Sequence, residues 1–172
     1  MTLSPELTQK FNDQITLEFE ASLVYRQLAI AADTQDLSGM AAWLRHQADE
    51  EIVHANKFID HVVDRGGEAR IGAIPAPAVA AEPSPVEIFE AALAHEEKVS
   101  ESIRVLYRAA EAEGDLFSRP LLNWFLEEQI EEEATVGEIV GQLRMVGDDG
   151  SGVLRIDSRL AARPVETTEN ED

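Results

Sequence analysis

Residues 40–58 read MAAWLRHQADEEIVHANKF, and this stretch decides the fold. Positions spaced alternately three and four residues apart form a seam that is apolar at both ends and polar in the middle: Met40, Leu44, Gln47, Glu51, His54 and Phe58. Such spacing is typical of an amphipathic helix that packs in a bundle. The polar centre of the seam predicts that a glutamate and a histidine enter the core of that bundle.

Glycines, prolines and short polar runs divide the remaining chain into further helical segments. Long helices, each about 40 Å in length, are expected over residues 5–33, 38–66, 84–112 and 119–146, and a short one over residues 153–162. Because the second link is long and rich in proline, alanine and glycine, the second and third helices can run in the same direction. The sequence therefore predicts an all-α four-helix bundle with one long crossover connection and a short fifth C-terminal helix.

The domain organisation follows from the same segments. The bundle and its fifth helix are expected to form one domain over residues 1–162. Residues 163–172 are rich in acidic and polar side chains, and we expect them to form a disordered acidic tail.

Composition excludes several classes of function. The chain has 14 Lys and Arg against 34 Asp and Glu, a formal net charge of −20, and no cysteine. Such a charge repels nucleic-acid phosphates and anionic membranes but attracts cations. The absence of cysteine excludes disulfides, zinc fingers and iron–sulfur clusters. Because we find neither a secretory signal nor a stretch that could span a bilayer, we expect a cytoplasmic protein with no nucleic-acid or membrane partner.

The other three helices carry seams of the same kind. The third reads Val86, Phe89, Leu93, Glu96, Ser100, Ile103 and Tyr107, again with a glutamate in the middle. Each helix has one such residue about twelve positions after its start: Glu18, Glu51, Glu96 and Glu132. Any one of these glutamates taken alone could face water, but four at matched depth indicate a polar layer across the core.

A buried layer of carboxylates requires a counter-charge. An ionised carboxylate removed from water costs several kcal/mol unless it is paired, and the seams carry no lysine or arginine at that level. Two divalent cations would balance four carboxylates, and neutral His54 and Gln129 would complete the ligand shell. Oxygen-rich ligation with one imidazole suits iron or manganese. Protonation of the glutamates is the alternative, and it would leave a poorly packed acidic cavity.

Four motifs at this level resemble one known family. They read NDQITLEFEASLVY over residues 12–25, DEEIVH over residues 49–54, HEEK over residues 95–98 and WFLEEQIEEE over residues 124–133. Together they resemble the bacterial-type, non-haem ferritins of the ferritin-like di-iron family, over roughly residues 5–162. The resemblance implies a ferritin-like bundle and an intra-subunit di-iron centre.

The resemblance also implies individual roles. Glu18, Glu51 and His54 would hold one iron, with Glu51 bridging to a second iron held by Glu96 and Glu132. Gln129 would lie near that second iron. Tyr25 and Trp124 would lie beside the centre as electron donors. A third iron site, facing the inside of a protein cage, would be formed by Glu50, Glu128 and Glu131.

The implied function is iron storage by a ferroxidase. Fe(II) would be oxidised by O2 or H2O2 and deposited as hydrated ferric oxide inside a hollow homo-oligomer of 24 subunits. Ile52 stands where a haem-binding relative has its methionine ligand, so no haem is expected. Two alternatives remain: a peroxide-detoxifying ferritin-like protein that stores little iron, and a non-catalytic acidic helical scaffold.

Overall fold

The computed structural model describes residues 2–162, and the acidic tail expected over residues 163–172 lies outside the described residues. The described chain is all-α, as predicted, with five helices: α1 (Pro5–Asp33), α2 (Ser38–Asp64), α3 (Pro85–Ala112), α4 (Arg119–Val146) and α5 (Gly150–Ala161). None of these helices combines the length and the apolar character that a membrane span requires.

Side-chain caps mark where α1, α3 and α5 begin. The Ser4 hydroxyl accepts a hydrogen bond from the Leu7 amide at 3.0 Å, and Ser84 forms a reciprocal capping box with Glu87 at the start of α3. Helix α5 begins three residues earlier than predicted because the Asp149 carboxylate caps its first turn. Gly150 and Gly152 are therefore helical, and the break falls before them at Gly147, which ends α4.

A residue of α5 caps the amino terminus of α2. No side chain before α2 caps its amino terminus, but the Asp157 carboxylate of α5 accepts a hydrogen bond from the Met40 amide at 2.8 Å. Gly39 makes this approach possible, since a Cβ at that position would lie 2.0 Å from the Asp157 carbonyl oxygen. The fifth helix is thus docked against the start of α2.

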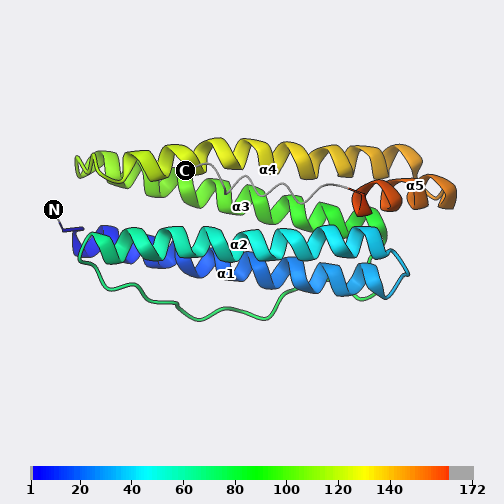
Figure 1. Ribbon diagram of the computed structural model, residues 1–172, viewed down its shortest axis with the longest axis horizontal. Helices are drawn as coiled ribbons and strands as arrows, with labels where there is room; N and C mark the ends of the chain where they lie inside the picture. Colours follow the sequence, from blue (N-terminus) through cyan, green and yellow to red (C-terminus); the bar gives the residue numbers. More distant parts are fainter. Residues whose placement is uncertain (1, 163–172) are drawn as a thin grey trace.

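Figure 1 shows the order of the helices in space. Helices α1 and α2 run antiparallel as one pair, α3 and α4 form the other, and α5 lies at the end of the bundle where α2 begins. The long link returns along the bundle, so α2 and α3 run in the same direction. Asn12 and Thr16 of α1 hold this link through hydrogen bonds to the backbone of Glu68, Arg70 and Gly72.

The core has a polar layer between two hydrophobic clusters. The cluster near α5 contains Leu28, Met40, Leu44 and other residues, and the cluster at the opposite end includes Phe58. Phe58 and Phe125 stack there at 4.0 Å between ring centroids, and both are fully buried. These two clusters fix the positions of the helices on either side of the polar layer.

One predicted seam was partly wrong. On α3, Val86, Leu93 and Tyr107 are only half-buried. Residues beside the predicted seam are buried as well, among them Ile88, Ala92, Val99 and Leu106. Helix α3 presents a broader face to the core than a strict three-and-four spacing describes, because it packs against both α1 and α4. The central residue Glu96 is buried in either register.

Candidate metal centre

Four glutamates, one from each long helix, are buried in the polar layer. Glu18 is 0% exposed, Glu51 2%, Glu96 1% and Glu132 8%. Between residues 2 and 162, no buried position is occupied by lysine or arginine. The structure therefore brings together the four acids that the sequence placed at one depth, without a basic side chain buried among them.

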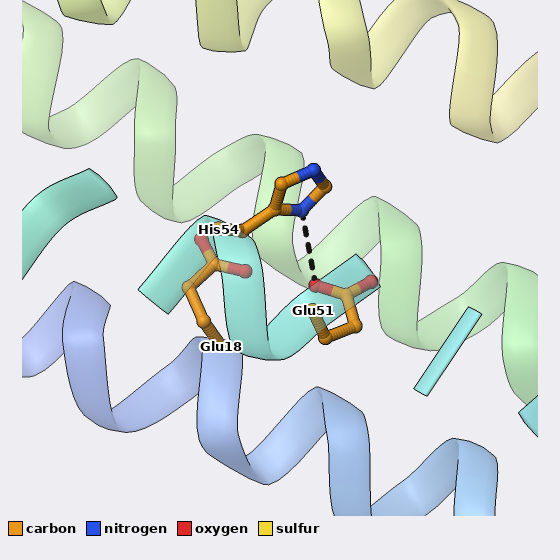
Figure 2. A group of neighbouring side chains, drawn as sticks. All are labelled: Glu18, Glu51 and His54. Carbon is orange, nitrogen blue, oxygen red and sulfur yellow. Dashed lines mark hydrogen bonds and ion pairs between the residues drawn. The ribbon is translucent and has the colours of Figure 1, made fainter. Parts of the chain in front are cut away.

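Three of the predicted ligands converge on one point. Carboxylate oxygens of Glu18 and Glu51 and a ring nitrogen of His54 all lie within 4.8 Å of one another. Figure 2 shows the Glu18 carboxylate extending from α1 toward Glu51 and His54 of α2. His54 Nδ1 lies 3.3 Å from Glu51 Oε2. The spacing of Glu51 and His54, three residues apart, places both side chains on one face of α2. A metal ion at this point would be reached by ligand atoms from two helices.

The other two glutamates are held by hydrogen bonds. The Tyr25 hydroxyl donates to Glu96, and the Gln129 amide nitrogen donates to the same carboxylate at 3.2 Å. Glu132 accepts a hydrogen bond from the Gln47 amide at 2.9 Å. Tyr25 and Gln129 thus lie beside the acids as predicted.

Two glutamines were not predicted to act in the site. Gln14 donates to Glu18 at 2.7 Å, and Gln47 donates to Glu132. Both precede a buried acid by one helical turn on a predicted seam, which was the available signal. Two buried oxygens on α1, Gln14 Oε1 and Glu18 Oε2, have no hydrogen-bond partner. Such oxygens are free to bind a cation.

Burial raises the pKa values of all four carboxyl groups, and mutual repulsion adds to it at Glu18, Glu51 and Glu132. Burial is the largest cause at each site, and the next cause for Glu18 is the charge of Glu51. The charges of Glu96 and Glu132 raise the pKa of Glu51 further. For Glu96, the hydrogen bond from Tyr25 partly offsets the effect of burial on its pKa. The pKa of Glu132 rises to about 8 through burial and the charge of Glu96.

The donor set fits divalent cations. Carboxylate oxygens with one imidazole suit iron, manganese or zinc, and the chain offers no thiolate that would select another chemistry. Glu51 interacts through its charge with Glu18 on one side and with Glu96 and Glu132 on the other, so it connects the converging trio to the other two acids. A cation there would hold these carboxylates ionised in place of the protons that burial favours.

The residues expected to form a third site are only partly gathered. Glu128 is 9% exposed and Glu50 is half-buried, and the charge of each raises the pKa of Glu132. Glu131 is exposed to solvent on α4. Among residues 2–162, the converging trio of potential ligands is Glu18, Glu51 and His54, and Glu131 does not join it.

Two aromatic side chains of α4 pack against the His54 ring. The rings of Trp124 and His54 meet edge to face at 5.7 Å between centroids. The rings of Phe125 and His54 also meet edge to face, with their centroids 5.5 Å apart. Trp124 therefore contacts a candidate ligand directly.

Comparison with known proteins agrees with this geometry. The family model described as Ferritin-like domain matches residues 8–146. The bacterial non-heme ferritin of Escherichia coli O6:H1 is 33% identical over 159 residues, which are 92% of this chain and 96% of the relative. That of Staphylococcus saprophyticus is 36% identical over 167 residues, 97% of this chain and 99% of the relative.

A solved structure is similar over nearly the same length. The open pore ferritin of the hyperthermophilic archaeon Archaeoglobus fulgidus matches with a TM-score of 0.91 and 34% identity, covering 94% of this chain and 99% of that chain. The sequence, the bundle and the buried acids thus point to the same relatives. The chain belongs to the ferritin-like domain family.

Proposed function

We propose that this chain is the subunit of an iron-storage ferritin that oxidises Fe(II) at a di-iron ferroxidase centre. The observation that carries the proposal is the layer of four buried glutamates with His54 and no buried basic residue between residues 2 and 162. The similarity to bacterial non-heme ferritins over 92% of the chain supports the same function. O2 or H2O2 would accept the electrons, and ferric product would be stored as hydrated oxide.

The proposed roles follow the contacts of each side chain. Glu18, Glu51 and His54 hold the first Fe(II), because their donor atoms already converge within 4.8 Å. Glu51 also binds the second Fe(II) together with Glu96 and Glu132. Two ions bridged in this way are held close enough to deliver electrons to one oxidant molecule.

Three neighbouring side chains support these ligands in the proposal. Gln129 and Tyr25 hold the Glu96 carboxylate through hydrogen bonds. Gln47 does the same for Glu132. These donors hold both carboxylates in place, and the second ion must displace or share their hydrogen bonds when it arrives.

The test is rapid mixing of Fe(II) with metal-free protein. Fe(II) is added anaerobically, oxygen follows, and absorbance and particle size are recorded on the same sample. We expect a fast phase at about two Fe(II) per chain, followed by mineral growth in a large hollow particle. Slow oxidation at the buffer rate in a small oligomer would overturn the proposal in favour of an acidic scaffold.

Two variants, one at a buried acid and one at an exposed acid, test the assigned centre directly. Glu51→Ala removes the acid that contacts both halves of the centre, so the fast phase should disappear while the particle still assembles. Glu127→Gln changes an exposed acid on α4 and serves as the matched control, with a fast phase equal to that of the parent. Wild-type oxidation in Glu51→Ala would refute the assigned centre.

The finer features of the family are proposed on the same basis. Glu50, Glu128 and Glu131 form a third iron site at the solvent edge of the layer, supported by the charge coupling of Glu50 and Glu128 to Glu132. Glu131→Gln should then reduce the iron bound per chain by about one ion while keeping the fast phase. Twenty-four subunits form the shell, which analytical ultracentrifugation would distinguish from a smaller cage.

A further inference from the structure

A lysine lies over the tryptophan that contacts the candidate centre. The Lys57 ammonium is 4.5 Å from the ring centroid of Trp124. The indole edge in turn meets the His54 ring at 5.7 Å between centroids. Lys57 follows His54 by one turn of α2, so the same helix presents the imidazole and the ammonium to one tryptophan of α4.

A cation in this position changes how easily the indole gives up an electron. The ammonium is attracted to the electron-rich face of the neutral ring. When an electron leaves, the ring becomes positively charged, and that attraction turns into repulsion at the same distance. Because Trp124 is half-buried, bulk water screens the two charges only in part. Lys57 therefore disfavours oxidation of Trp124.

We propose that Lys57 is a positioning residue that makes Trp124 harder to oxidise and so limits when Trp124 donates an electron to the centre. This inference rests on the proposed function, which supplies the oxidant. When only one Fe(II) is bound, reduction of H2O2 to two waters needs one electron from that Fe(II), one from Trp124 and two protons from solvent. The ammonium makes the second electron harder to remove, so Trp124 is oxidised only when a second Fe(II) is absent.

The test uses metal-free protein, so it does not depend on ferroxidase activity. The chain has two tryptophans, and Trp43→Phe leaves Trp124 as the single indole. Trp43 packs against the rings of Tyr25 and Phe89, where a phenylalanine keeps an aromatic contact. In this background, a flash generates triplet riboflavin, a neutral oxidant that takes one electron from the indole and becomes the flavin radical anion.

Two substitutions separate charge from shape. Lys57→Met keeps the length of the side chain and removes its charge, and we expect electron transfer from Trp124 to accelerate on the order of fivefold. Lys57→Arg keeps the charge, so its rate should stay within about twofold of the parent. Equal rates for Lys57→Met and the parent would overturn the proposal.

Access to the ring is measured separately. Acrylamide quenches indole fluorescence on collision, so its quenching constant for Trp124 reports exposure of the ring in each variant. An acceleration in Lys57→Met that is matched by an equal rise in acrylamide quenching would also overturn the proposal. If Lys57→Met does not fold, Lys57→Gln provides the neutral side chain for the same comparison.

A second measurement connects the effect to iron. One Fe(II) per chain is added to the same three proteins with H2O2, and oxidised Trp124 is quantified by peptide mass spectrometry. Oxidation of Trp124 should rise severalfold in Lys57→Met and stay at the parent level in Lys57→Arg. A difference in the flash experiment without a difference here would mean that Trp124 does not supply the electron, which would overturn the proposal. The proposed function is tested separately, by the fast phase at about two Fe(II) per chain.

Discussion

Binding of a divalent metal to this chain should release protons, because the buried acids hold them in the metal-free protein. The pKa of Glu132 is raised to about 8 by burial and by the charge of Glu96. The pKa values of Glu18, Glu51 and Glu96 are raised in the same direction. A metal ion binds the ionised carboxylate, so each proton must leave as the ion enters.

The expected number can be worked out for Glu132. With a pKa of about 8, this carboxyl group carries about 0.9 proton at pH 7 and about 0.1 proton at pH 9. Glu132 alone should therefore contribute about 0.9 proton per chain at pH 7. Below pH 8, the apparent metal affinity should rise about tenfold per pH unit for each proton displaced.

Calorimetry measures this release directly. Zn(II), which undergoes no redox chemistry, is titrated anaerobically into metal-free protein at pH 7 in two buffers with different heats of ionisation. The difference in observed heat gives the protons released per chain at saturation. Glu132→Gln, a neutral side chain of the same shape, should lower this number by at least about 0.9.

The control for this experiment is Glu127→Gln. Glu127 is exposed on the same helix, so its replacement should leave the proton count unchanged. If the parent bound zinc at pH 7 with the same heat in both buffers, the buried acids would already be ionised without metal. Burial would then not keep these acids protonated in the metal-free protein, whatever the identity of the physiological metal.

Three further predictions concern stability. Since the pKa of folded Glu132 lies above that of an unfolded glutamate, the metal-free protein should lose roughly 2–3 kcal/mol of unfolding free energy between pH 5.5 and 7.5. Urea unfolding should show this loss, and Glu132→Gln should reduce it. Gly39→Ala would place a Cβ 2.0 Å from the Asp157 carbonyl oxygen, so α5 should shift and unfolding free energy should fall by about 1–3 kcal/mol, with Ser38→Ala as a control at the preceding position. Phe58→Ala leaves a cavity beside stacked Phe125 and should cost about 3–5 kcal/mol; a loss below about 1 kcal/mol would mean that the core refills.

The positions of the four acids could be predicted because the seam of a long helix indicates both which face is buried and how far along the helix each buried residue lies. Glu18, Glu51, Glu96 and Glu132 each sit in the middle of a seam whose ends are apolar. Two hydrophobic ends fix the register of a long helix, so its centre has little freedom to rotate. This is why Glu96 is buried even though other positions of the predicted α3 seam were wrong.

Contacts between distant segments could not be predicted in the same way. Asp157 caps α2 across more than a hundred residues, and Gly39 permits that contact only because of how α5 docks. Lys57 lies over Trp124 because of the distance between α2 and α4, which no single helix encodes. Such features depend on how the helices pack together, whereas periodicity reports only which face of each helix is buried.

The two halves of the proposed centre differ in how far they are prepared for metal. The donor atoms of Glu18, Glu51 and His54 already converge, and Glu18 Oε2 has no hydrogen-bond partner to give up. By contrast, Glu96 and Glu132 accept hydrogen bonds from Tyr25, Gln129 and Gln47, which an incoming ion must displace or share.

This difference favours an order of binding in the proposed centre. The first ion meets a preformed trio and replaces the protons that burial and mutual repulsion favour there. Its charge then lowers the pKa of Glu51, which the charge of Glu96 in the other half raises in the metal-free protein. The second ion therefore finds the bridging carboxylate already ionised, and the hydrogen-bond donors around Glu96 and Glu132 are the remaining obstacle to its entry.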